Sequence, residues 1–186
     1  MSDPARRNPS YEDILALPEH LVGEILAGEL HTHPRPAPRH ARAYSALGYL
    51  VGGPFDGGRD GPGGWWILDE PELHFGADIV VPDIAGWRRE RLPTLPETAW
   101  FELAPDWTCE ILSPATARTD RAVKMPIYAR EGDPHLWLVD PDARTLEVYR
   151  LQDDGHWLLL ETLKQDDPVR QPPFEAISFP LGELWA

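Results

Sequence analysis

The feature that most constrains this chain is a carboxylate inside an apolar run. Glu110 lies within the segment DWTCEIL, where Trp107, Ile111 and Leu112 indicate a buried strand. Burying an unpaired charge costs several kcal/mol, so Glu110 needs a partner there. The sequence therefore indicates that a metal ion or a nearby cationic side chain accompanies Glu110.

The chain has 186 residues, enough for one domain with a substantial core. We expect residues 1–9 to be frayed and residues 10–186 to form that single domain. No apolar run approaches the ~20 residues of a membrane span, and the N-terminus lacks the apolar region of a secretory signal. Cys109 is the single cysteine, so no internal disulfide can form. These features predict a cytoplasmic protein with no membrane partner.

The formal net charge of −14 opposes binding to nucleic acid, because binding a polyanion depends on Lys and Arg. Any DNA site on this chain must therefore be a local patch, or must depend on bridging cations.

Hydrophobic spacing and capping residues predict three helices, at about 10–17, 40–51 and 116–131. The second is expected to end before the pair Gly52–Gly53. The third is expected to be capped by either Thr116 or Thr119 and closed by Gly132. Pro126 is awkward inside the third helix because it lacks an amide hydrogen. That helix must either start near Lys124 or bend at the proline.

Strand-like runs follow the first two helices. Residues 22–33 are either a helix end that passes into a strand or a first hairpin, and Ile79–Trp87 is a central strand or hairpin. Residues 135–141 and 145–151 form a hairpin, and a further strand follows at 156–163. Early helices, a mostly antiparallel sheet and one mid-chain helix predict an α+β domain.

A second carboxylate, Asp83, ends the apolar run VVPD on the strand that we expect beside Glu110. Two carboxylates on adjacent strands can share a divalent cation. Mg²⁺ commonly takes one or two carboxylates, together with waters and substrate phosphates. Such an ion activates water and neutralises charge on a phosphoryl group.

The segments VVPDIAGW and WTCEILSP resemble the PD-(D/E)XK nuclease motif, with Asp83 as the first acid and Glu110 as the second. In order and spacing, GEILAGEL, VPDIAGW, CEILSPATARTDRAVKMPIYAREG and HLWLVDPDARTLEVYRL are similar to the Uma-two family of restriction-endonuclease-like proteins. The resemblance covers roughly residues 11–186.

This sequence departs from the wider superfamily at one position. Leu112 stands two residues after Glu110, where the lysine of the motif is expected on the same strand face. The Uma-two pattern implies that the basic residue has moved to the following helix, where Lys124 matches it. Asp120, Lys124 and Tyr128 recur at i, i+4 and i+8, so they share one helical face that can turn towards Glu110.

The resemblance also implies roles for two residues nearer the N-terminus. Glu29, in AGEL, would complete the metal shell or position a water molecule, and His40, in PRH, would contact phosphate. An equally plausible interpretation is that Glu29 and the nearby Glu24 are simply exposed to solvent and have no functional role.

Simpler readings exist for the other site residues. Asp83 can form a turn through its own backbone, and Glu110 can pair with an arginine without any metal. Lys124 can simply pair with Asp120, a contact worth ~0.2–0.5 kcal/mol, and Tyr128 can be a packing residue.

The resemblance implies a restriction-endonuclease-like core, in which helices flank a central, mixed but mostly antiparallel sheet. It further implies a DNA endonuclease that hydrolyses phosphodiester bonds with Mg²⁺ or Mn²⁺. The alternatives are a catalytically inactive binding or regulatory protein that keeps the fold, and a phosphohydrolase for a small nucleotide. Because C₂ dimers are the commonest oligomers, we also expect a homodimer, with the hairpin 135–160 as a candidate interface.

Overall fold

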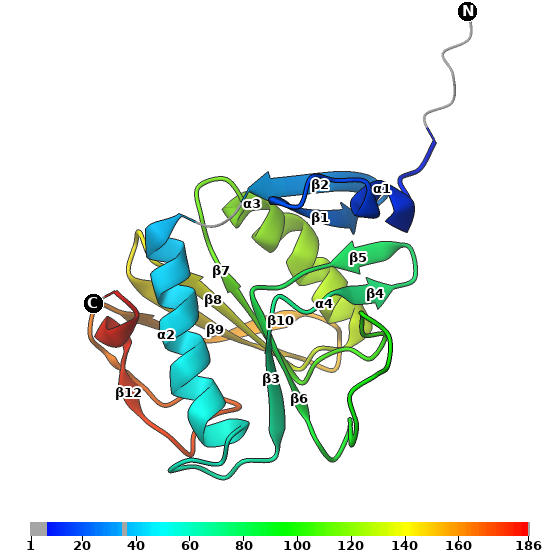
Figure 1. Cartoon of the computed structure of the whole chain (residues 1–186). Coiled ribbons are helices and arrows are strands. Elements are labelled where there is room, and N and C mark those ends of the chain that lie inside the picture. The colour runs from blue at the N-terminus through cyan, green and yellow to red at the C-terminus, as the bar shows by residue number, and fades with distance from the viewer. Residues whose placement is uncertain (1–6, 35–36, 186) are drawn as a thin grey trace, which may run out of the picture.

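The computed structural model describes residues 7–34 and 37–185 (Figure 1). Most of the expected frayed terminus 1–9 lies outside these residues. Within the described part, Arg7 pairs with Asp13 at 2.6 Å. Helix α1 (Tyr11–Leu15) begins after the N-cap Ser10, as the sequence predicts. Of the two alternatives for residues 22–33, the structure shows the hairpin, which consists of β1 (Leu21–Leu26) and β2 (Glu29–Pro34).

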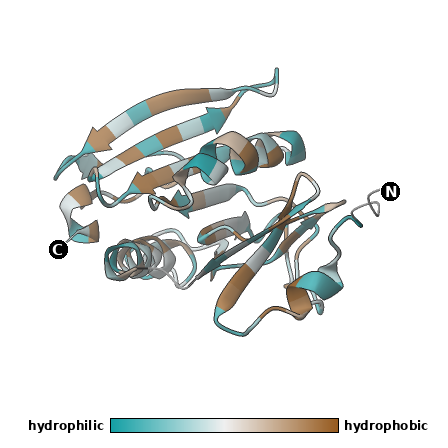
Figure 2. Ribbon diagram, turned by 90° about the horizontal axis from the view of Figure 1, so that it is seen from above, coloured by the Kyte–Doolittle hydropathy of each residue, from teal (hydrophilic) through white to brown (hydrophobic). Residues whose placement is uncertain are grey.

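A six-stranded sheet forms the centre of the fold, in the order β10-β9-β8-β7-β6-β3. Only β7 and β8 pair in parallel, so the sheet is mixed but mostly antiparallel, as expected. Its strands are β3 (Trp65–Asp69), β6 (Ile84–Arg88), β7 (Trp107–Ile111), β8 (His135–Asp140), β9 (Thr145–Leu151) and β10 (Trp157–Lys164). Hydrophobic and polar residues alternate along the first part of β9, where Leu146 and Val148 are buried, and Figure 2 shows hydrophobic and hydrophilic bands on the strands.

A four-stranded sheet, in the order β2-β1-β5-β4, stands beside the larger one. It contains β4 (Leu73–Phe75) and β5 (Asp78–Val80). The prediction of one central strand or hairpin at Ile79–Trp87 is therefore wrong. The residues Val81–Pro82–Asp83 separate β5 from β6, and the two strands belong to different sheets. Pro82 has no amide hydrogen for a sheet ladder, which favours a break at this point.

Helix α2 (Pro38–Phe55) covers one face of the six-stranded sheet (Figure 1). It is longer than predicted, because it continues through Gly52 and Gly53. Val51 and Phe55 are both buried in the core, and their burial stabilises the added turn.

A second helical segment covers the opposite face. It comprises α3 (Ala117–Thr119), the π-helical turn η1 (Asp120–Lys124) and α4 (Met125–Glu131). Gly132, with φ of 81°, ends the segment in the left-handed conformation that glycine adopts without strain. The chain closes with the short pair β11 (Pro168–Val169) and β12 (Phe179–Pro180) and with the 3₁₀ turn η2 (Leu181–Leu184).

The two faces of β7 have different surroundings because strand side chains alternate. Trp107, Cys109 and Ile111 belong to the hydrophobic cluster that includes residues of α2. Thr108 and Glu110 point to the other face, where α4 packs through Ile127 and Tyr128. Strand alternation thus places Glu110 beneath the segment that carries Lys124.

Candidate active site

A cavity of about 660 Å³ opens where the β1–β2 hairpin, the start of α2, the end of β7 and the turn η1 meet. Asp83, Glu110, Asp120, Lys124 and His40 all line it. The structure therefore brings together in one cavity five residues that lie up to 84 positions apart in the chain.

Asp83 and Glu110 reach this cavity from neighbouring antiparallel strands. Ile84 pairs with Cys109, so the residue that precedes β6 lies across from the end of β7. Asp83 Oδ2 accepts a hydrogen bond from the amide of Ile111 at 2.7 Å, and its Oδ1 lies 3.3 Å from His40 Nε2. Both acids thus line the same cavity, Asp83 just before β6 and Glu110 near the end of β7.

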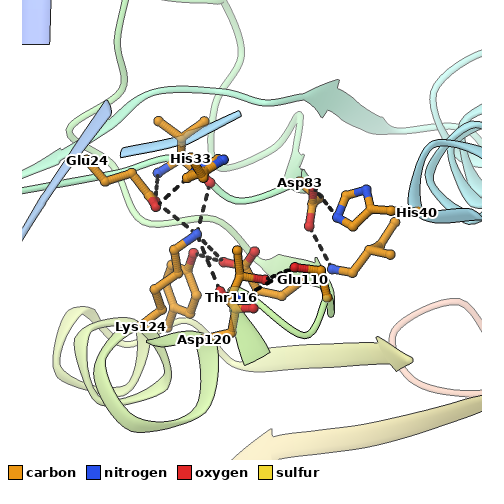
Figure 3. A network of polar contacts seen from close by, with 12 residues as sticks. Glu24, His33, His40, Asp83, Glu110, Thr116, Asp120 and Lys124 are labelled. Atoms are coloured by element: carbon orange, nitrogen blue, oxygen red, sulfur yellow. Dashed lines mark hydrogen bonds and ion pairs between the residues drawn. The ribbon is translucent and has the colours of Figure 1, made fainter. Parts of the chain in front are cut away.

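Lys124 lies at the centre of an acidic cluster (Figure 3). Its Nζ is 2.9 Å from Glu24 Oε1, 3.2 Å from Glu110 Oε1 and 3.8 Å from Asp120 Oδ1. It also donates a hydrogen bond to the Val81 carbonyl at 3.1 Å. The ammonium group accordingly occupies the position of a counter-ion to three buried carboxylates.

The turn η1 explains how Lys124 is placed despite the nearby Pro126. The amide of Met125 bonds to the carbonyl of Asp120, five residues back, which is the spacing of a π-helix. The widened turn precedes the proline, and Pro126 falls in the first turn of α4, where its missing amide hydrogen costs little. The regular helix α4 therefore begins directly after Lys124, which is one of the two expected alternatives, and the π turn joins it to α3. Asp120, Lys124 and Tyr128 still face the same cluster.

Burial and charge have opposite effects on the ionisable groups of the cluster. Burial raises the pKa of Glu110 well above its usual value; Lys124 partly offsets this, and the acids Asp120, Asp83 and Glu24 add to it. Burial likewise raises the pKa of Asp120, to about 6. For Lys124, burial alone would lower the pKa, but Glu110, Glu24 and Asp120 reverse this and raise it. Lys124 is therefore charged. Its positive charge only partly offsets the effect of burial on the pKa values of Glu110 and Asp120.

His40 and Tyr128 each contact one of the two motif acids. Burial would lower the pKa of His40, but its contact with Asp83 outweighs burial and raises it. The hydroxyl of Tyr128 donates to Glu110 Oε1, and burial followed by the charge of Glu110 raises the pKa of the phenol well above its usual value. The neutral Tyr128 thus holds Glu110 in place, while His40 orients Asp83.

The structure does not bring Glu29 into the site. Glu29 directly follows the hairpin turn, where it pairs with Leu26, and its side chain is 82% exposed. The acid from this hairpin that reaches the cluster is Glu24, which is 2% exposed and whose Oε1 also accepts a hydrogen bond from the amide of Val81 at 2.7 Å. The distinguishing signal is the position of Glu24 in mid-strand, three residues before the turn Ala27–Gly28.

The β1–β2 hairpin also directs His33 towards the cluster. Its Nε2 lies 3.4 Å from Glu24 Oε2. Burial would raise the pKa of Glu24, but Lys124, His33 and the amide of Val81 outweigh burial and lower it. Glu24 is therefore the ionised partner of Lys124.

Replacing Glu24 with Gln is expected to lower the free energy of unfolding by about 1–3 kcal/mol, because the buried Lys124 loses its nearest carboxylate. The same change at the exposed Glu29 is expected to have an effect within about 0.5 kcal/mol. Urea unfolding of both variants at pH 7 measures the difference. Equal losses would contradict the assignment of Glu24 to the cluster.

The oxygen donors of Asp83 and Glu110 suit a hard dication such as Mg²⁺ or Mn²⁺, which needs only one or two carboxylates when waters and substrate complete its shell. In residues 7–34 and 37–185, no group of three or more His, Cys, Asp or Glu side chains has metal-holding geometry. The donor set thus fits a two-carboxylate site of the kind that uses substrate oxygens.

The mixed, mostly antiparallel sheet with helices on both faces is the fold that the resemblance to restriction-endonuclease-like proteins implies. A solved structure has the same fold: a "putative nuclease belonging to DUF820" from Anabaena variabilis. It is 26% identical, has a TM-score of 0.70, and the match covers 94% of this chain and 96% of that chain. The chain belongs to the Uma2 family, described as "Putative restriction endonuclease", whose family model matches residues 11–182.

No functionally curated protein matches the chain. None of the helices in the described part of the chain is long and apolar enough to cross a membrane.

Proposed function

We propose that this protein is a metal-dependent DNA endonuclease that hydrolyses phosphodiester bonds at the cavity lined by Asp83 and Glu110. The observation that carries the proposal is the convergence of these two acids, from adjacent strands, with the ammonium group of Lys124 3.2 Å from Glu110. The family membership reported above supports nuclease chemistry in general.

Asp83 and Glu110 would hold Mg²⁺ or Mn²⁺. When bound, such an ion polarises the phosphoryl oxygens and lowers the pKa of a coordinated water. Asp83 is already oriented by the amide of Ile111 and by His40, and Glu110 by Tyr128. This orientation lowers the cost of bringing both acids into a reactive geometry.

Lys124 contributes positive charge beside the attacked phosphate. A fixed cation in a buried site stabilises developing negative charge more strongly than a solvated one. His40 is 14% exposed at the cavity wall, so it can contact a phosphate oxygen while its Nε2 faces Asp83. These roles make Asp83, Glu110 and Lys124 the central residues, with His40 and Tyr128 as positioning residues.

Cleavage of supercoiled plasmid and of circular single-stranded DNA with Mg²⁺ or Mn²⁺ tests the proposal. We expect Asp83→Ala and Glu110→Ala to reduce the cleavage rate at least about 100-fold, because each removes an oxygen ligand of the metal. Asp83→Asn removes the negative charge that binds the metal but keeps the fold, because the asparagine oxygen can still accept the hydrogen bond from the amide of Ile111. Glu161→Ala, at an exposed position on β10, is the matched control and should cut like the wild type. Equal cleavage by all variants would remove the proposal.

A second candidate is a binding or regulatory protein without catalysis. It is favoured by the place of Lys124, whose ammonium already neutralises the acids without a metal, and by Leu112, which is buried where the motif has its lysine. Calorimetric titration with Mg²⁺ and Mn²⁺ discriminates between the two. Binding at low-millimolar concentration that disappears in Asp83→Ala would count against this second candidate.

A further inference from the structure

The charged groups of the candidate active site lie at the bottom of the cavity. Glu110 is 2% exposed and Lys124 is 4% exposed. A phosphodiester can reach them only if it enters the cavity. Duplex DNA is stiff, with a persistence length of about 50 nm, and cannot easily direct a single phosphate inward. An unpaired strand bends freely and can insert one nucleotide.

The walls of the cavity are poorly suited to the phosphates that flank a cut site in a duplex. Lys124 is the one Lys or Arg among the described lining residues, and three carboxylates already surround it. Two exposed acids, Glu19 and Glu70, also line the opening. Duplex-binding proteins commonly neutralise about 6–10 phosphates with Lys and Arg. The chain as a whole carries a formal charge of −14.

The same walls are well suited to a base. The ring side chains of His20, His33, His40 and Tyr44 line the cavity. Unpaired bases stack on aromatic rings with little regard to sequence, because every base has a π-face. The volume of about 660 Å³ falls within the range of about 300–1,000 Å³ that is typical of small-ligand sites.

We propose that the substrate is an unpaired nucleotide within or at the end of a DNA strand, inserted into the cavity with its base against the ring side chains. This inference rests on the proposed function for the cleavage step only. Strand preference in binding can be measured without any cleavage.

The binding test uses a fluorescein-labelled 20-nucleotide strand, alone and annealed to its complement, with Ca²⁺ in place of Mg²⁺. We expect the single strand to bind at least about tenfold more tightly than the duplex. Each neutralised phosphate of a single strand contributes about −0.7 to the slope of log affinity against log salt concentration. One or two neutralised phosphates should therefore give a slope of about −1. Equal or tighter duplex binding, or no binding to either, overturns the proposal.

Cleavage with Mg²⁺ or Mn²⁺ is then followed on a duplex that carries an unpaired 3′ tail. We expect cuts in the tail and a largely intact paired body. If the paired part of the duplex is cut as fast as its unpaired tail, the proposed strand preference is overturned. If the single strand is bound preferentially but never cut, the proposed nuclease function fails and the strand preference stands.

His20 offers a variant with little risk to folding, because its side chain is exposed in the turn before β1. His20→Ala is expected to weaken binding of the single strand about fivefold through loss of a stacking surface. His156→Ala, whose side chain is 82% exposed away from this cavity, is the matched control and should bind like the wild type. Identical binding by the two variants would contradict base stacking at His20.

Discussion

Replacing Lys124 with Met is expected to lower the free energy of unfolding by about 3–5 kcal/mol, because removing one member of a buried ion cluster leaves the others uncompensated. Glu24, Glu110 and Asp120 all lie within 3.8 Å of the Lys124 Nζ, and each is buried. Methionine keeps most of the apolar volume, so the loss reports charge and hydrogen bonding more than packing. Urea unfolding at pH 7 measures the change.

Lys164→Met provides the matched control. Lys164 is exposed at the end of β10, and its replacement should change the unfolding free energy by no more than about 0.5 kcal/mol. Millimolar Mg²⁺ is expected to recover part of the stability lost in Lys124→Met, since a dication can neutralise the same acids. A loss below about 1 kcal/mol in Lys124→Met would mean that the acids are neutral in the native protein and need no counter-ion.

The stability of the protein is expected to fall as the pH rises from about 5.5 to 8, and Asp133 is expected to cause much of that fall. Burial raises the pKa of Asp133 to about 8, against the lowering effect of its hydrogen bonds with Thr108 and with the amide of His135. In the unfolded chain the carboxyl ionises near its ordinary value of about 4. Between these two values the folded state holds a proton that the unfolded state has released. Stability therefore declines by about 1 kcal/mol per pH unit through this window.

The variant Asp133→Asn removes this titration. Its unfolding free energy relative to that of the wild type should rise steadily from pH 5.5 to pH 8, by about 3 kcal/mol in all. Urea unfolding at four pH values in this range follows the difference. Asp154→Asn controls for the loss of an exposed acid, since its side chain is 71% exposed. A constant difference between Asp133→Asn and the wild type across the range would contradict a raised pKa at Asp133.

The sequence was sufficient to predict which elements carry the candidate site. The meeting of Asp83 and Glu110 follows from strand pairing, and the shared face of Asp120, Lys124 and Tyr128 follows from the helical repeat. The helical repeat is local, and a single sequence displays it directly. The pairing of the strands beside Asp83 and Glu110 is not local, and the resemblance to a known motif indicated it.

What the sequence could not supply depends on contacts between distant segments. Glu24 and Glu29 are both acids of one hairpin. The mid-strand position of Glu24 favours its burial, but its packing against Lys124, a hundred residues away, is what establishes it. Ile79–Trp87 reads as one apolar run, and its division between two sheets depends on which strands lie beside it. The homodimer expected through the hairpin 135–160 stays a prediction.

The π turn at Asp120–Lys124 indicates how related sequences of different length can keep this arrangement. A π turn contains one residue more than an α turn, so deleting a single residue there would restore a regular α-helix. Because the wider turn takes up its extra residue locally, the helical turns on either side would keep nearly the same orientation after the deletion. Tyr128 would still lie beside Glu110. Single-residue deletions within this turn should therefore leave the tyrosine in place.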